Sequence, residues 1–65
     1  VEVTAGPSQY GTFDTSFSIG LSDYWNTDLA NGVSVGSSYT ITGFINHYYG
    51  NYEVLTSDNS DIVAQ

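Results

Sequence analysis

The chain has 65 residues with no lysine, arginine or cysteine, so its seven acidic residues give a formal net charge of −7. This composition excludes disulfide bonds and thiolate metal sites, and it removes the basic side chains that neutralise nucleic-acid phosphates and anionic membrane surfaces. Because hydrophobic residues make up 40% of the chain and charged residues only 11%, we expect a folded unit over residues 1–65, and a single domain at this length.

The first half of the chain alternates apolar and polar residues, which predicts β-strands. Residues 1–5 form a short first strand, ended by a Gly-Pro-Ser sequence. The alternation over residues 12–21 predicts one long strand with Phe13 and Phe17 facing the core. Because this strand is long, we expect it to bend near Gly20.

The middle of the chain allows two interpretations. Residues 27–32 are compatible with one helical turn, with Asn26 as its cap and Gly32 as a left-handed stop. Alternatively, the Asn-Gly pair at positions 31 and 32 turns a hairpin into residues 33–35. We favour the helical turn slightly.

The second half predicts a hairpin. Residues 38–49 alternate as a strand, with Tyr39 facing inward and Gly43 marking a bulge or a sharp coil. The Gly-Asn pair at positions 50 and 51 is a signal for a two-residue turn, and residues 52–56 form the return strand. Residues 62–64 predict a last edge strand after a polar loop.

A resemblance covers about half of the chain, over residues 33–62. Residues 33–45, with the sequence VSVGSSYTITGFI, resemble a pattern found in extracellular bacterial OB-fold domains, in which a short valine-rich segment leads into a strand with a Thr-Gly pair. Residues 48–54 look like the tyrosine–glycine turn and short strand that follow, and Asp61-Ile62 looks like the common end. The resemblance implies a small Greek-key barrel that binds oligonucleotides or oligosaccharides.

The predicted fold class is therefore all-β. We expect a small Greek-key OB-like barrel or a compact antiparallel sandwich, with about 4–6 short strands and at most one short helical turn. The absence of Lys and Arg disfavours nucleic acid as the ligand of such a barrel. No apolar run is long enough for a membrane span, so we expect no membrane insertion.

Aromatic residues outside the regular alternation are the candidate ligand or assembly contacts. Tyr24 and Trp25 are adjacent and could form a stacking platform or an intersubunit plug, although a lid over one end of the barrel is an equal alternative. His47, Tyr48 and Tyr49 span both faces of a strand, so at least one of these rings should be exposed. For His47 an outward histidine that only hydrogen-bonds is favoured over a catalytic base, and we expect no enzyme activity.

Two oxygen-rich segments are candidates for a weak calcium site, one at Asp58 and Asp61 and one at Asp23 and Asp28. Their spacing differs from that of an EF-hand, and Asx-turn residues are the favoured interpretation of both segments. We therefore predict no cofactor.

These observations give two functional hypotheses. The first is a secreted or cell-surface structural module, such as a filament or layer subunit, that associates with itself through strand edges and aromatic contacts. The alternative is an extracellular OB-type module that binds a glycan through stacking rings and neutral polar groups. The absence of trypsin sites suits the first of these, because a structural module outside the cell must last.

Overall fold

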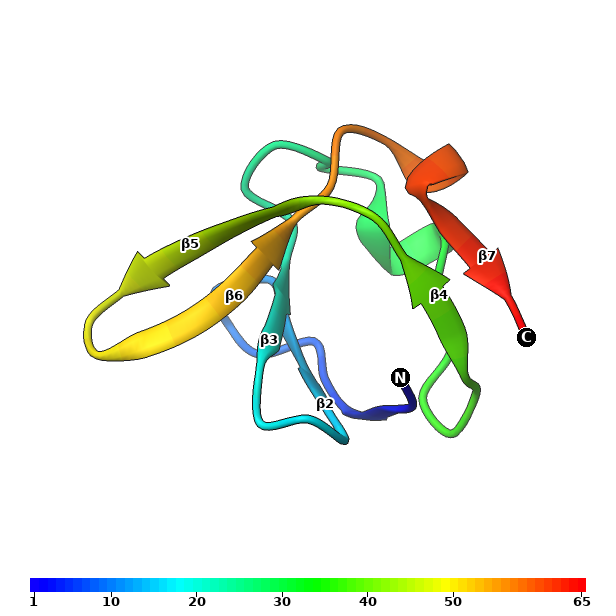
Figure 1. Ribbon diagram of the computed structural model, residues 1–65, viewed down its shortest axis with the longest axis horizontal. Coiled ribbons are helices and arrows are strands. Elements are labelled where there is room, and N and C mark those ends of the chain that lie inside the picture. The colour runs from blue at the N-terminus through cyan, green and yellow to red at the C-terminus, as the bar shows by residue number, and fades with distance from the viewer.

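The protein is a small all-β fold, as the sequence predicts. The computed structural model describes the backbone of residues 1–65 and every side chain other than that of Tyr48. Seven strands and two 3₁₀ turns follow one another (Figure 1): β1 (Val3–Ala5), β2 (Thr12–Thr15), β3 (Gly20–Ser22), η1 (Leu29–Asn31), β4 (Tyr39–Ile41), β5 (Phe44–Tyr48), β6 (Asn51–Leu55), η2 (Asn59–Asp61) and β7 (Ile62–Ala64). The described chain thus has more strands, and one more helical turn, than expected.

The strands follow one another around the molecule in the order β1-β2-β3-β6-β5, and β4 pairs with β7 in a second, two-stranded sheet. All pairs are antiparallel except β3 with β6, which run parallel. The two sheets meet at the start of β1, where Glu2 bridges Ser38 and the Tyr39 N–H donates to the Val1 carbonyl over 2.7 Å. Only two residues separate β4 from β5, which is the last strand of the larger sheet. Because β4 also bonds to the start of β1, the strands close around a core.

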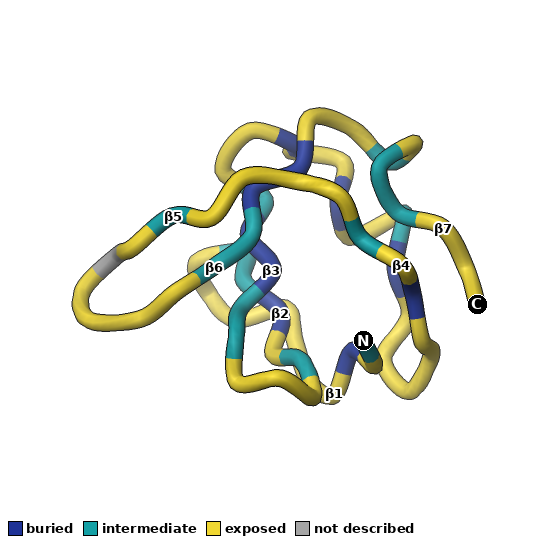
Figure 2. Tube along the Cα trace, viewed as in Figure 1, coloured by how far each residue is buried: buried dark blue, intermediate teal, exposed yellow. Residues whose placement is uncertain are grey.

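The core lies between the two sheets, where Figure 2 shows the buried segments. Alternate residues of the strands enter it, because successive side chains of a strand point to opposite faces. Leu29 enters from η1 and is fully buried. The buried cluster consists of Val3, Phe13, Leu21, Leu29, Val33 and Tyr39, with Ile41, Val54 and Ile62 partly buried against it. The Tyr39 hydroxyl accepts a 2.7 Å hydrogen bond from the Ser34 N–H, so this buried ring keeps its polar end satisfied.

The long strand predicted over residues 12–21 is wrong, because the chain reverses direction in its middle. β2 and β3 form a hairpin around residues 16–19, and Ser18 has a positive φ of 59°. The Thr15 hydroxyl donates to the Ile19 carbonyl over 2.6 Å and so ties the two ends of the turn together. Phe17, predicted to face the core, is therefore 75% exposed.

The predicted break at Gly43 and the hairpin that follows are both present. β4 ends at Ile41 and β5 begins at Phe44, and a Cβ on Gly43 would lie 2.5 Å from the Leu55 carbonyl oxygen. The hairpin turn lies one residue earlier than predicted, at Tyr49 and Gly50, because Tyr48 pairs with Asn51. The return strand accordingly runs from Asn51 to Leu55.

The helical turn forms, but its predicted caps are wrong. η1 begins after Asp28, and Gly32 at its end has a φ of −99°, which is right-handed. Gly32 is required there for space instead, since a Cβ on it would lie 2.5 Å from the Asn59 side chain. Asn26 is buried and donates from Nδ2 to the Asn59 Oδ1 over 2.7 Å and to the Thr56 hydroxyl over 3.2 Å. It thus joins two distant segments as well as accepting the Asp28 N–H.

Candidate functional site

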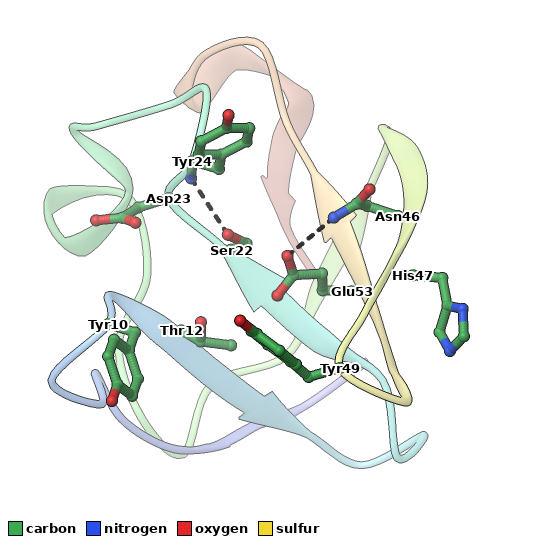
Figure 3. Close-up of a pocket in the computed structure, with 9 residues that line it drawn as sticks. All are labelled: Tyr10, Thr12, Ser22, Asp23, Tyr24, Asn46, His47, Tyr49 and Glu53. Carbon is green, nitrogen blue, oxygen red and sulfur yellow. Dashed lines mark hydrogen bonds between the residues drawn. The ribbon is translucent and has the colours of Figure 1, made fainter.

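A cavity of about 780 Å³ lies on the outer face of the five-stranded sheet (Figure 3). Its volume falls within the range typical of ligand pockets, roughly 300–1,000 Å³. Residues from four strands and three loops line it: Tyr10, Thr12, Ser22, Asp23, Tyr24, Asn46, His47, Tyr49 and Glu53. Since these positions are far apart in the sequence, the strand pairing creates the cavity.

The floor of the cavity is polar because the alternation that directs apolar residues into the core places polar residues on the opposite face of the strands. Thr12 lies opposite Ser22 across β2 and β3, whereas the neighbouring pair Phe13 and Leu21 enters the core. Glu53 continues the floor on β6. The floor therefore offers hydroxyl and carboxylate groups.

Asn46 and Glu53 form a cross-strand pair on β5 and β6. The Asn46 Nδ2 donates to Glu53 Oε1 over 3.2 Å, which fixes the carboxylate in position. The Glu53 side chain points toward the middle of the lining residues in Figure 3. It is therefore placed to accept hydrogen bonds from a ligand.

Three tyrosines form the rim of the cavity. Tyr10 comes from the loop between β1 and β2, Tyr24 follows β3, and Tyr49 lies in the turn between β5 and β6. Their exposed fractions are 79%, 73% and 87%, far above those of core aromatics such as Phe13. Rings so exposed around one cavity provide flat apolar faces for a ligand to stack on.

The backbone conformation of Tyr49 is unusual for a residue with a bulky side chain. Tyr49 has a φ of 50° and Gly50 a φ of 80°, as a primed two-residue turn requires. Asn, Asp or Gly is preferred at the first of these positions, because a bulky residue is strained at positive φ. Tyr49 therefore occupies a strained position, where a smaller residue would be preferred.

The structure brings together three of the five predicted contact residues, namely Tyr24, His47 and Tyr49. The His47 ring stacks on Tyr52, with a centroid distance of 4.8 Å and an interplanar angle of 23°. In Figure 3 that ring is directed away from the other lining residues, so His47 only borders the cavity. The predicted contact at Tyr48 lies outside the described side chains.

Trp25 is separated from its neighbour Tyr24. Its ring packs edge-on against Phe44 of β5, with the centroids 5.5 Å apart, and does not line the cavity. The two adjacent aromatics therefore do not form one platform. Trp25 instead covers the start of β5, and remains about half exposed.

The two oxygen-rich segments serve as local turns and caps. The Asp58 carboxylate accepts hydrogen bonds from the Ser60 hydroxyl and N–H, which hold the pKa of Asp58 below its ordinary value. Asp61 accepts from the Ser57 N–H over 2.8 Å, and Asp28 accepts from Asn31 over 2.6 Å. Within the described residues, no group of three or more Asp, Glu, His or Cys side chains is arranged to hold a metal ion.

Sequence reasoning missed Tyr10, Thr12, Ser22, Asn46 and Glu53 as lining residues. Two signals could have indicated part of this set. Tyr10 is an aromatic residue between two predicted breaks, and Glu53 is the only acidic residue in the second hairpin. Their convergence could not be read from either signal, because it depends on the parallel pairing of β3 with β6.

Comparison with known proteins identified no relative: no protein-family model, no curated protein and no solved structure matches the chain. Among the described residues, no helix is long and apolar enough to cross a membrane.

Proposed function

We propose that this chain is a secreted or cell-surface OB-like module that binds a glycan in the tyrosine-rimmed cavity. The observation that carries the proposal is the cavity itself, in which three exposed tyrosine rings surround a floor of hydroxyl, amide and carboxylate groups. Sugars bind through stacking of their C–H faces on aromatic rings and through hydrogen bonds to neutral polar groups. The proposed role is binding without catalysis.

The order of the strands supports the OB-like assignment. If β4 and β5 are counted as one broken strand, six strands remain. Five of them follow the order of the larger sheet, with β3 parallel to β6, and the sixth, β7, pairs with β4. OB-folds bind their ligands on the face of the second and third strands, between the loop joining strands 1 and 2 and the loop joining strands 4 and 5. The cavity lies on β2 and β3 together with β5 and β6, and Tyr10 and Tyr49 lie in the two corresponding loops.

The charge of the chain favours one of the two ligand classes of such a barrel. A nucleic-acid strand carries one phosphate per nucleotide, and its binding depends on Lys and Arg side chains. This chain has neither, and the cavity contains two carboxylates. A neutral glycan experiences no such repulsion, so the cavity favours sugar over nucleic acid.

The test is calorimetric titration with a panel of neutral hexasaccharides of different linkage. We expect at least one to bind, and Tyr24→Ala to weaken that binding by about threefold to tenfold, the range for loss of one aromatic contact. Phe17→Ala is the matched control, because it removes an equally exposed ring that does not line the cavity. A flat response across the panel, or equal losses in the two variants, would refute the proposal.

Self-association is a second candidate, favoured by the outer edge of β5. Within the described chain β5 is the last strand of its sheet and pairs with β6 alone. Phe44 and Ile45 are more than 60% exposed on it, and the strand carries no charged residue. An uncharged, apolar edge strand is a template for pairing with another chain, so β5 could join copies into a filament or layer.

Light scattering at increasing protein concentration tests this second candidate. We expect Ile45→Lys to prevent association, because a lysine on an edge strand opposes pairing. Val63→Lys, at a similarly exposed position on β7, is the control and should leave association unchanged. A wild-type chain that stays monomeric at high concentration would exclude assembly through β5.

A further inference from the structure

The two carboxylates of the cavity have no cationic partner. Asp23 and Glu53 both line it, and the chain contains no Lys or Arg that could reach either of them. In Figure 3, Glu53 lies toward the middle of the lining residues, whereas Asp23 lies at one margin with its carboxylate directed away from the middle. A ligand would therefore meet negative charge at two places.

Each of the two carboxylates keeps at least one oxygen that accepts no hydrogen bond from the described residues. Glu53 accepts one hydrogen bond, from Asn46 to Oε1, which leaves Oε2 available. The Asp23 carboxylate lies over Gly11, where an added Cβ would come within 2.3 Å of it. Among the described residues, no group donates a hydrogen bond to the Asp23 side chain.

We propose that the cavity selects glycans that carry protonated primary amines, namely oligosaccharides of amino sugars, over neutral glycans of the same linkage. This inference rests on the proposed glycan-binding function and names the ligand class of the same site. An ammonium group can donate to Glu53 Oε2 and to Asp23, and the adjacent tyrosine faces attract cations through their ring quadrupoles. The remaining hydroxyls of each sugar can bond to Thr12 and Asn46 on the floor.

The size and composition of the cavity favour an amino sugar over a lysine-rich peptide. A single ammonium group needs only a small aromatic cage. This cavity has a volume of about 780 Å³ and a floor of neutral polar groups, which a lysine side chain would leave without partners. A sugar oligomer supplies hydroxyl groups together with its amines, and so can pair with both kinds of residue.

Three β-1,4-linked hexasaccharides provide a direct test, because they differ only in the substituent at C2: hydroxyl (cellohexaose), free amine (glucosamine hexamer) or N-acetyl. By calorimetry at low salt, we expect the glucosamine hexamer to bind roughly tenfold more tightly than cellohexaose, for two partly exposed ammonium–carboxylate contacts. The advantage should shrink as salt is added. Equal affinities for the amine and hydroxyl forms would overturn the inference.

Carboxylate variants locate the effect. The double variant Asp23→Asn with Glu53→Gln should lose the preference for the amine, so that its affinities for the glucosamine hexamer and for cellohexaose become equal. The matched control, Asp14→Asn with Glu2→Gln, removes the same charge from exposed positions outside the cavity and should keep the preference. If the control pair loses the preference equally, the net charge of the chain explains it, and the inference is wrong.

Two further outcomes separate the inference from the function on which it rests. Hexalysine that binds as tightly as the glucosamine hexamer, with the same dependence on Asp23 and Glu53, would overturn selection for a glycan. If neither these hexasaccharides nor the neutral panel binds, the proposed function itself fails. If cellohexaose binds and the amine gives no gain, only the inference fails.

Discussion

The packed end of the molecule and the β5–β6 hairpin use the same kinds of residue in opposite ways. At the packed end, η1 places Leu29 in the core with its side chain fully buried, and Asn26 is hydrogen-bonded to Thr56 and Asn59. On the hairpin, Phe44 and Tyr49 are largely exposed, and Figure 2 shows that most of this segment faces solvent. Stability is thus concentrated at one end and contact surface at the other.

This difference matters because a 65-residue chain buries little surface and therefore has a small free energy of unfolding. A cavity rimmed by exposed rings does not bury apolar surface within the chain, so the remaining residues must hold the fold together. In the described part of the chain the core cluster is small, with six buried members. We therefore expect substitutions at the packed end to affect mainly the free energy of unfolding, and substitutions around the cavity to affect mainly binding.

The largest expected effect is at Leu29. Leu29→Ala should lower the free energy of unfolding by about 3 kcal/mol, because it leaves a cavity in the core cluster at a fully buried position. Urea denaturation followed by circular dichroism measures this loss. Val35→Ala, at a half-exposed position, should change the same quantity by less than about 0.5 kcal/mol. If both variants lost similar amounts of unfolding free energy, the packed end would not be the main source of stability.

A smaller loss is expected at Gly32. Gly32→Ala would force the Asn59 side chain away from Asn26 and so break a hydrogen bond of 2.7 Å, at a cost of about 1–2 kcal/mol. The control is a double-mutant cycle with Asn59→Ala, in which the new methyl group has space. Gly32→Ala should then cost clearly less than it does alone. Additive losses would show that Asn59 is not the group displaced.

The sequence predicts those features that depend on neighbouring residues. The hairpin of β5 and β6 follows from alternation and turn residues, and Gly43 marks the break between β4 and β5. The turn after Thr15 was missed because Phe17 and Ile19 continue the alternation by chance, although Phe17 is exposed. The positive φ of Ser18 and the hydrogen bond from the Thr15 hydroxyl to the Ile19 carbonyl mark this turn, and the alternation of apolar and polar residues reports neither of them.

The candidate site was predictable only in part, for a physical reason. Tyr24, His47 and Tyr49 stood out as rings outside the core pattern, and they do line the cavity. Whether such a ring joins the cavity depends on direction: Trp25 turns toward Phe44, whereas its neighbour Tyr24 does not. Glu53 reaches the cavity because its strand β6 pairs in parallel with β3, and a pairing between strands so far apart in the sequence is not encoded in local patterns.

Tyr49 gives the sharpest form of the comparison, because stability and binding should change there in opposite directions. Tyr49→Asn places a residue preferred at positive φ in the turn and should raise the free energy of unfolding by about 0.5–1 kcal/mol. The same variant loses a ring from the rim, so its glycan affinity should fall. Tyr52→Asn, in the regular strand β6, is the control and should destabilise the protein, since it removes the ring that stacks on His47. A destabilised Tyr49→Asn would show that this tyrosine serves the fold.

The smallest expected effect is the titration of Asp58, which caps η2 at the packed end. Hydrogen bonds from the Ser60 hydroxyl and N–H lower the pKa of Asp58 from its ordinary value of 3.8. Because the pKa is lower in the folded state, the contribution of this cap is complete above pH 3.8 and is lost as the pH falls through the folded value. A carboxyl carbon NMR titration should show the pKa rising toward 3.8 in Ser60→Ala. Ser57→Ala keeps its backbone bond to Asp61 and should leave the pKa of Asp58 unchanged. An equal shift in the two variants would mean that the general charge of the loop, and not the cap, sets this pKa.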